Sequence, residues 1–571
     1  MRVLVVNLTR FGDLLQSQSG IAALSAGGHE VGLVCLDNFA PATALLRGVE
    51  HVFPLHGGRL LKSMEAAPAI SGSRDQPVQP DWPAEFGALV LWRNELQEKF
   101  APDVVVNCTP FLSARLLSRF LAGNKPVFGF GVDANGYGDN QGQWASLLQG
   151  AKGLRGASPF NVADVFRAMM QAAVGERSHQ KDNERTTIPA NEPASDPARW
   201  ADFLPGALAR PTDESLAAMQ QRLAALCPPA ATGRIRGYVA LQLGASEKRR
   251  QWPVASFAAI GQQCWQEHGL CPVLLGSKHE EELGLSYASC AASPFISLCG
   301  QTDLPELASA LCCCKLLLTN DTGTMHLAAG LNVPVFAIFL ATAQPFDTGP
   351  CLPGSFSFEP DMDCHPCAFG VACPHGNACQ QAIVPEAVWP FVRTRLANTT
   401  CGPAAGVETG VSKKSGARVW RTMRRAGGML SLESFSGHDG TDRAVWLAAQ
   451  QVFLEVFLTG GQPEILEPIG LSAEGAQEAG ADIATILGYM TILEKQGEVL
   501  GVRAIPAMRA KFLQSWNAVT EAMCKSRWTA ALGPIWVDDT QKEGQNITQT
   551  IAVIAKYRAL LGTVHSVLTK E

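Results

Sequence analysis

A chain of 571 residues is too long for a single hydrophobic core, and the usual size of domains predicts about three or four of them. The apolar content of 47% and charged content of 17% are typical of a globular protein and exclude a chain that is disordered throughout. The net charge of -6 excludes a general nucleic-acid binder, which needs a basic surface to displace counterions from phosphates. We therefore expect any anion site to be local.

The start of the chain, MRVLVVNL, predicts a strand, because it lacks the long apolar stretch and small-residue cleavage site of a signal peptide. No stretch reaches the roughly 18 uninterrupted apolar residues that span a bilayer, so we expect no transmembrane segment. Most of the 17 cysteines lie singly in apolar segments, where free thiols behave as small hydrophobic side chains. We therefore expect a cytoplasmic protein, since the cytoplasm keeps thiols reduced.

The first half of the chain alternates short apolar runs with helical stretches, which predicts βαβ units. Strands are expected at 2–8, 30–36, 51–55, 103–109 and 126–131, and helices at 14–26, 42–47 and 86–100. The strands are continuous apolar runs, as buried parallel strands are. From about 175 to 236 the composition shifts to Pro, Asp, Glu, Arg and Thr, which indicates a connection between two halves.

The second half repeats this pattern, with strands expected in YVALQLGA, CPVLLGS, FISLCG, KLLLTND and VPVFAIF and a helix from Pro253 to His268. It predicts a second doubly wound sheet, and two such sheets leave a cleft that the carboxyl ends of their strands face. After residue 400 a Gly/Ser/Lys-rich segment precedes stretches of helical period at 442–459, 477–496 and 548–569. We therefore expect an all-helical C-terminal appendage.

The expected domains are an N-terminal Rossmann-like domain at 1–185, an irregular or helical connection at 186–235 and a second Rossmann-like domain at 236–400. A linker at 401–418 then leads to a helical domain at 419–571, whose size is typical of a separate domain.

The segment KLLLTNDTGTMHLAAG places a polar cluster, Asp321 to His326, between an apolar strand and a helix. The backbone amides of Thr322, Gly323 and Thr324 are expected at the helix N-terminus, where unpaired N–H groups and the helix dipole favour a phosphate. The alternative is an ordinary capped helix, because Asn, Asp, Thr and Gly are also the favoured capping residues.

A second strand ends in Gly244 and Ser246, and Lys248, Arg249 and Arg250 follow before the helix that Pro253 opens. Basic side chains at this point can neutralise a diphosphate. The alternative is a solvated run of charges beside a proline helix start.

The first βα turn carries Arg10, Gly12 and Asp13. A dinucleotide fingerprint requires G-x-G-x-x-G, and only one glycine is present, which disfavours a nicotinamide or flavin enzyme. An aspartate at a helix start is by default an N-cap, but the same carboxylate at the rim of a cleft can act as a general base.

Four segments together resemble glycosyltransferase family 9, the ADP-heptose:lipopolysaccharide heptosyltransferases, over roughly residues 1–400. They are the N-terminal strand with Gly12-Asp13, the GAS turn followed by RQWP at 244–253, the pattern LCGQTDLPELASAL, and the block NDTGTMHLAAGLNVPVFAIF. The resemblance implies an inverting enzyme of GT-B fold, two Rossmann-like domains facing a cleft. It implies a donor in the second domain and an acceptor against the first.

The resemblance also implies roles for single residues. Asp13 matches the general base that deprotonates the acceptor hydroxyl, and Gly12 and Arg10 lie on the acceptor side. Donor-binding residues are expected at Gly244, Ser246, Lys248, Arg250, Asp321, Thr322, Gly323, Thr324 and His326. Arg250 departs from the family pattern, in which a lysine commonly binds the diphosphate. Positive side chains and helix amides can stabilise the departing diphosphate, so we expect no cofactor for the chemistry.

Four cysteines, Cys364, Cys367, Cys373 and Cys379, lie within sixteen positions. This spacing suits a tetrahedral structural metal, zinc or iron, with His365 and His375 as substitute ligands. Two disulfides or unpaired thiols are the alternatives. Similar clusters occur in the family, and in its protein-modifying members they resemble an iron-binding finger. We expect a structural role near the acceptor or at a subunit interface.

The leading hypothesis is therefore transfer of a heptose or related sugar from an ADP-sugar to a lipopolysaccharide core or another glycan. Peripheral contact with the cytoplasmic face of the inner membrane and an oligomer are compatible with it. One alternative keeps the fold and replaces the glycan by a protein hydroxyl as acceptor. Another is a catalytically silent scaffold that only binds nucleotide.

Overall fold

The computed structural model describes residues 1–56, 82–151, 156–183, 206–228, 233–397, 416–425, 428–464, 467–503, 505–544 and 546–569. The chain forms two compact units. Unit 1 comprises Met1–Gly131 and Asn161–Ser436, and unit 2 comprises Val132–Phe160 and Gly437–Glu571. Each unit is therefore built from two stretches of chain.

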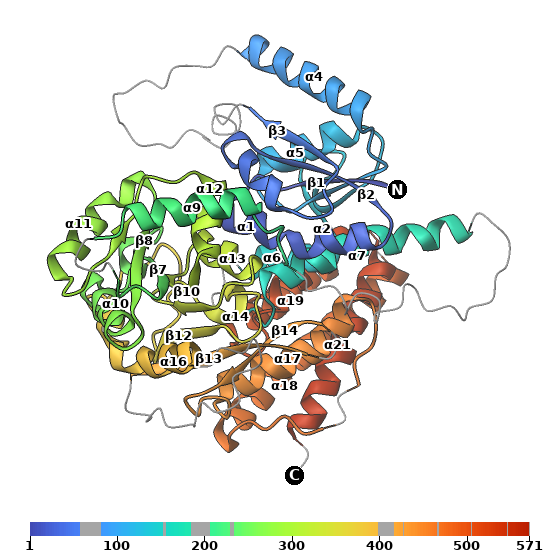
Figure 1. Ribbon diagram of the computed structural model, residues 1–571. Coiled ribbons are helices and arrows are strands. Elements are labelled where there is room, and N and C mark those ends of the chain that lie inside the picture. The colour runs from blue at the N-terminus through green and yellow to red at the C-terminus, as the bar shows by residue number, and fades with distance from the viewer. Residues whose placement is uncertain are drawn as a thin grey trace, which may run out of the picture. The chain divides into compact units, whose positions relative to one another are not determined.

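The first sheet of unit 1 contains parallel strands in the order β3-β2-β1-β4-β5 (Figure 1). The strands are β1 (Arg2–Val6), β2 (Glu30–Leu36), β3 (His51–Leu55), β4 (Val104–Asn107) and β5 (Val127–Val132). The accompanying helices are α1 (Phe11–Gln16), α2 (Gln18–Ala26), η1 (Asp37–Leu45), α4 (Trp82–Lys99), α5 (Leu112–Ala122) and α7 (Val162–Asn183). The continuous apolar runs of β1 and β4 are buried almost throughout, as expected for parallel strands covered on both faces.

Two helices near the N-terminus differ from their predictions. The helix expected at 14–26 begins at Phe11 and is divided at Ser17, whose hydroxyl donates to the carbonyl of Leu14 at 2.6 Å. The helix expected at 42–47 is a 3₁₀ helix over Asp37–Leu45, with Pro41 inside it. A proline cannot donate an α-helical hydrogen bond, which favours the tighter and shorter form.

The second sheet of unit 1 has the order β14-β13-β12-β11-β10-β7-β8-β9. Its strands are β7 (Gly237–Gln242), β8 (Leu270–Leu275), β9 (Ile296–Ser297), β10 (Cys314–Asn320), β11 (Val335–Ile338), β12 (Phe356–Pro360), β13 (Ala417–Arg424) and β14 (Leu430–Ser434). The strands from β9 to β12 in this order are parallel, and β13 and β14 are antiparallel additions. The two doubly wound sheets confirm the predicted α/β fold class.

Helices surround this second sheet in chain order. They are α9 (Asp213–Ala225), η3 (Lys248–Arg250), α10 (Val254–His268), η4 (Lys278–Glu280), α11 (Glu281–Cys290), α12 (Leu304–Cys312), α13 (Gly323–Gly330), α14 (Pro345–Thr348), α15 (Cys379–Ala382) and α16 (Pro385–Ala397). The core between them contains large buried side chains such as Trp252, Phe336 and Phe391. The connection expected at 186–235 lies largely outside the described residues, apart from the segment that carries α9.

The strands β13 and β14 correct the expected start of the helical domain at 419, which falls inside β13. Basic residues dominate the segment and suggested a linker, but alternate positions such as Ala417 and Val419 are buried. Arg421 on β13 pairs across the hairpin with Glu433 on β14. One polar face and one buried face are typical of an antiparallel edge, and a composition argument does not detect this alternation. Most of the linker expected at 401–418 lies outside the described residues.

Unit 2 contains the helices α6 (Gln143–Ala151), α17 (Asp442–Leu458), α18 (Ala473–Val502), α19 (Pro506–Lys525), α20 (Gly533–Lys542) and α21 (Ile547–Leu568), with the strand β6 (Gly138–Gln141). The predicted helical C-terminal region is therefore present. It also includes residues 132–160, which we had expected within the N-terminal domain at 1–185.

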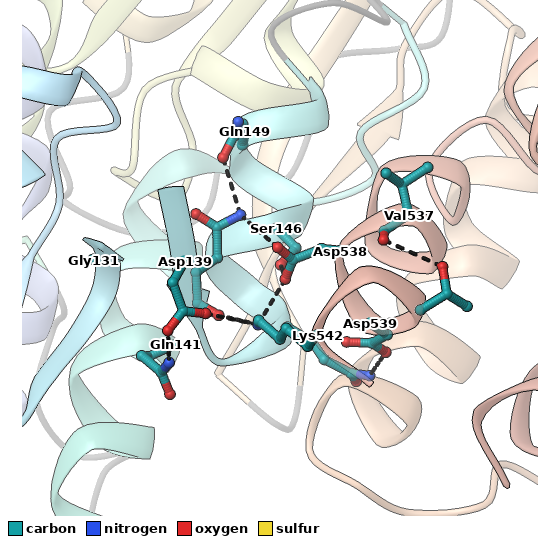
Figure 2. Close-up of polar contacts among 12 residues, drawn as sticks. Gly131, Asp139, Gln141, Ser146, Gln149, Val537, Asp538, Asp539 and Lys542 are labelled. Carbon is teal, nitrogen blue, oxygen red and sulfur yellow. Dashed lines mark hydrogen bonds and ion pairs between the residues drawn. The ribbon is translucent and has the colours of Figure 1, made fainter. Parts of the chain in front are cut away.

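Polar contacts show why residues 132–160 belong to the helical unit (Figure 2). The Asp538 carboxylate on α20 accepts from the Ser146 hydroxyl at 2.6 Å and pairs with Lys542 at 2.8 Å. Gly150 permits close packing, because a Cβ there would lie 2.2 Å from Pro534. Pairing between segments so far apart in sequence leaves no local pattern, so the boundary could not be predicted.

One helix among the described residues, α21, is long and apolar enough to cross a membrane by length and composition alone. It is weak evidence, because a core helix of a soluble protein passes the same test. The Tyr557 ring of α21 packs edge-on against Phe457 and Trp536, at centroid distances of 5.0 and 5.3 Å. These contacts fit a helix that belongs to the core of unit 2.

Candidate functional site

The polar block after β10 leads directly into the helix α13. Thr322 occupies the N-cap position in an extended conformation, but its side chain makes no capping hydrogen bond. Its hydroxyl instead lies 3.2 Å from the Thr319 hydroxyl. The capped-helix alternative therefore loses its main support, and the first turn of α13 retains the amides and dipole that favour an anion.

The three cations of the basic turn, residues 247–251, point to different partners. Arg250 pairs with the Asp321 carboxylate, and each of these side chains is only 11% exposed. A second Arg250 nitrogen, Nη1, donates to the Ser246 hydroxyl at 2.9 Å. Arg249 pairs with Glu247 at 2.7 Å, and Lys248 is exposed. Arg250 is thus the cation of this turn that lies at the start of α13.

Asn320, at the end of β10, joins the two polar turns. Its side-chain nitrogen donates to the carbonyls of Leu243 and Gly244 at 2.8 and 3.1 Å. Its side-chain oxygen accepts from the backbone N–H of Trp252 at 2.9 Å. This fully buried amide therefore fixes the carboxyl end of β7 and the exit of the basic turn to the carboxyl end of β10.

Glu280, after β8, lies against the other side of the same turn. A Cβ built on Gly244 would lie 1.3 Å from its Oε1, so only glycine fits there without moving Glu280. The Gln242 side chain donates to Glu280 at 3.2 Å and accepts from the Thr324 hydroxyl at 3.2 Å. The carboxyl ends of β7, β8 and β10 thus share one hydrogen-bonded network.

The first turn of α1 lies against the first turn of α13. A Cβ on Gly12 would meet the His326 ring at 2.9 Å, and a Cβ on Gly323 would meet the Phe11 ring at 2.6 Å. The two glycines permit this close approach of backbones from the two sheets. Asp13 is partly exposed in the same turn, and its backbone carbonyl accepts from the Asn7 side chain at 3.1 Å.

His326 is the buried titratable group at this contact. Burial lowers the pKa of His326 to about 4, although the neighbouring Asp13 carboxylate acts in the opposite direction. Its Nδ1 atom has no hydrogen-bond partner among the described residues. The imidazole is therefore neutral at physiological pH and leaves Asp13 without a cation from this side.

Most of the predicted site residues are thus brought together by the structure. Arg250, Ser246 and Asp321 form one cluster, and Gly12, Gly323 and His326 form the contact between α1 and α13. Lys248 and Arg10 have exposed side chains. The prediction missed Asn320, Gln242 and Glu280, although a buried polar residue at a strand end was a signal for the first two.

The four cysteines lie in a segment after β12 that we call the cysteine loop, residues 361–383. Burial raises the pKa of Cys367, and the other three thiols raise it further, so the four groups are close enough to interact. Among the described residues, which include all four cysteines, no group of three or more potential ligands is arranged to hold a metal. Every described cysteine is a free thiol.

His365 of the cysteine loop is buried against β12. Its Nε2 lies 3.2 Å from the Glu359 carboxylate, which also accepts from the Trp420 indole at 3.0 Å. Both charged side chains are almost fully buried. Its position favours an anchoring role over the ligand role that we considered for it. The loop itself contacts the basic turn of the second Rossmann-like domain, rather than the acceptor side or a subunit interface that we expected.

The model of one protein family, glycosyltransferase family 9 (heptosyltransferase), matches residues 205–368. Lipopolysaccharide heptosyltransferase 2 of Escherichia coli K12 is 31% identical over 101 residues, which are 17% of this chain and 29% of that protein. Lipooligosaccharide heptosyltransferase 2 of Campylobacter jejuni is 28% identical over 155 residues, 26% of this chain and 48% of that protein. The chain therefore matches less than half the length of these curated relatives. The resemblance to family 9 is confirmed for residues 205–368.

Solved structures of similar proteins include a family 9 glycosyltransferase from Veillonella parvula, with 15% identity and a TM-score of 0.48. That match covers 69% of this chain and 97% of the other. ADP-heptose lipopolysaccharide heptosyltransferase II of Escherichia coli has 17% identity and a TM-score of 0.46, covering 70% of this chain and 99% of the other.

Proposed function

We propose that this chain, whose residues 205–368 carry a glycosyltransferase family 9 domain, moves a heptose or related sugar from an ADP-sugar to a lipopolysaccharide core or other glycan. The observation that carries the proposal is the contact of α1 with α13, where Gly12 and Gly323 let Asp13 lie beside an anion-binding helix start. An inverting transfer requires a base at the acceptor hydroxyl and positive groups at the leaving diphosphate.

The donor diphosphate binds at the first turn of α13. The amides of Gly323 and Thr324 face it, and Arg250 supplies a guanidinium already oriented by Asp321 and Ser246. Glu280 follows the strand next to β7, where an acidic residue of a Rossmann-like domain accepts hydrogen bonds from a ribose. The nucleotide thus lies along the carboxyl ends of β8, β7 and β10.

Asp13 acts as the general base. It takes the proton of the acceptor hydroxyl while the hydroxyl oxygen bonds to the anomeric carbon and the bond from that carbon to the diphosphate breaks. The neutral His326 beside it does not form an ion pair with the carboxylate, which preserves its basicity. Arg250, Lys248 and the helix amides provide the charge for the departing diphosphate, so the proposed step requires no divalent cation.

We also propose that Cys364, Cys367, Cys373 and Cys379 hold a structural zinc or iron ion. The spacing of the four thiols and their mutual proximity support this, whereas their arrangement in the described structure does not form a ligand group. Metal analysis of the purified protein is expected to find about one ion per chain. Protein of full stability without zinc or iron would contradict the proposal.

The donor is tested by thermal-shift screening with a panel of nucleotide sugars. ADP-sugars are expected to raise the melting temperature of the wild type but not of Asp321→Ala, because that change releases Arg250. A panel in which no nucleotide sugar stabilises the wild type would overturn the donor assignment.

The acceptor is tested with labelled ADP-heptose and a membrane and protein extract of the host. Label in the glycolipid fraction supports the proposal, and label in polypeptide supports a protein O-heptosyltransferase instead. A silent scaffold predicts no label in either fraction and no phenotype for Asp13→Asn. In this proposal the enzyme works in the cytoplasm at the inner face of the membrane, and fractionation of cells with an antibody to the chain would locate it.

A further inference from the structure

The cysteine loop is hydrogen-bonded to the basic turn that carries Arg250. The Gln380 side-chain nitrogen donates to the carbonyls of Lys248 and Gln251, at 2.9 and 2.8 Å. From the other direction, Nη1 of Arg249 donates to the carbonyl of Val371 at 2.8 Å. The loop and the turn therefore hold each other through one amide and one guanidinium.

The two carbonyls that Gln380 binds lie on either side of Arg250. They begin and follow the three-residue 3₁₀ helix η3, whose own backbone bonds include Gln251 N–H to Lys248 C=O at 3.2 Å. So short a helix has little internal rigidity. A side chain that fixes both carbonyls also fixes the direction in which the backbone presents Arg250.

Further contacts continue the connection on the same side. The Trp252 indole donates to the carbonyl of Ile383, the last residue of the cysteine loop, at 2.7 Å. Cys379, the residue before Gln380, is buried, and Arg249 is close enough to Cys367 to lower its pKa against the effect of burial. The thiol cluster and the basic turn are thus parts of one packed arrangement.

We propose that the cysteine loop positions the basic turn for the donor diphosphate, with Gln380 and Arg249 as positioning residues that act through Arg250. Neither side chain needs to touch the donor. The inference rests on the proposed function and deepens it, because it gives the cysteine loop a task in donor binding as well as in stability.

The sharpest test compares Gln380→Glu with Gln381→Glu. The first replaces the donating amide by a carboxylate that faces two carbonyl oxygens, whereas the second makes the same change at the next, exposed residue. Loss of two hydrogen bonds is expected to weaken ADP binding by roughly tenfold in Gln380→Glu. The Gln381→Glu variant is expected to bind ADP as the wild type does.

A merely structural role is distinguished by the kinetic parameters. Positioning of the diphosphate in both ground and transition states raises KM for the ADP-sugar and leaves kcat within about twofold. The variant is expected to fold, because the Arg250–Asp321 pair and the Asn320 hydrogen bonds still hold the turn. Gln380→Met, which removes the donor without adding charge, is expected to show a smaller rise in KM in the same direction.

Arg249→Lys provides the second variant. It retains the charge beside Glu247 but loses the planar group that reaches both Glu247 and Val371, so a rise in KM of roughly threefold is expected. Equal ADP affinity in the wild type, Gln380→Glu and Arg249→Lys would overturn the inference while leaving the proposed function intact. A wild type that binds no ADP would instead overturn the proposed function, and the inference with it.

Discussion

The donor side and the Asp13 side of the site differ in how firmly their polar groups are held. On the donor side, Asn320, Gln242 and Arg250 each bond to at least two groups from neighbouring strands or turns. On the other side, Asp13 is partly exposed in a helix of six residues and Arg10 is exposed. The difference indicates a preorganised surface for the donor and a single reactive group for the acceptor.

The largest expected effect is on the Asp13 side. Asp13→Asn removes the base but no hydrogen bond of the donor network, so kcat is expected to fall by roughly 10² to 10⁴-fold. Steady-state kinetics with an ADP-sugar measures this. Asp37→Asn is the matched control, since Asp37 follows the neighbouring strand β2 and pairs only with the exposed His56 among the contacts described. Equal losses in both variants would contradict the assignment of the base.

On the donor side, Gly244→Ala tests the packing of the turn. Its Cβ would collide with Glu280, so we expect a loss of roughly 1–3 kcal/mol in unfolding free energy together with weaker ADP binding. Chemical denaturation and calorimetric titration measure the two effects. Shortening the obstacle in Gly244→Ala/Glu280→Ala should restore stability in part. Gly87→Ala serves as the control, because a Cβ there meets nothing within 4 Å.

A double-mutant cycle tests the ion pair at the start of α13. Arg250→Met and Asp321→Asn each leave a largely buried partner, so each is expected to cost about 1–3 kcal/mol of stability. The double variant should lose less than the sum of the two. Strict additivity in thermal or chemical denaturation would show that the two side chains do not interact in solution.

The smallest effect concerns the contact between the two sides. The pKa of folded His326 is about 4, below the unfolded value of 6.5, so only the unfolded chain takes up this proton between those pH values. Stability is therefore expected to fall as pH drops through this window, by at most about 1.4 kcal/mol per pH unit. His326→Gln should show a flatter pH dependence of unfolding free energy than His279→Gln, a change at an exposed position. Identical slopes would contradict the burial of a neutral imidazole.

The sequence predicted the parts of the fold that have a local pattern. Buried parallel strands such as β4 and β10 are continuous apolar runs, and the glycine and threonine block after β10 indicated a helix start with phosphate character. Arg250 and Asp321 were both assigned to the donor side, and the structure pairs them. These predictions succeeded because strand burial and helix starts are encoded within a few neighbouring residues.

Features that depend on distant segments could not be predicted. The packing of residues 132–160 with α20 rests on contacts such as Ser146 with Asp538, nearly four hundred residues apart. The strand β13 was hidden by its arginines, whose charges find partners such as Glu433 and Asp361 in the folded chain. The contact of the cysteine loop with the basic turn likewise joins Gln380 to carbonyl groups, which have no sequence signature at all.

The most direct measurement is calorimetric titration of ADP into the wild type, Asp13→Asn and Asp321→Ala. We expect the wild type and Asp13→Asn to bind ADP with equal affinity, because the base lies outside the donor network. Asp321→Ala is expected to bind at least roughly tenfold more weakly, since Arg250 loses its orienting partner. Absence of ADP binding to the wild type, or equal affinity in all three proteins, would contradict a donor site at the start of α13.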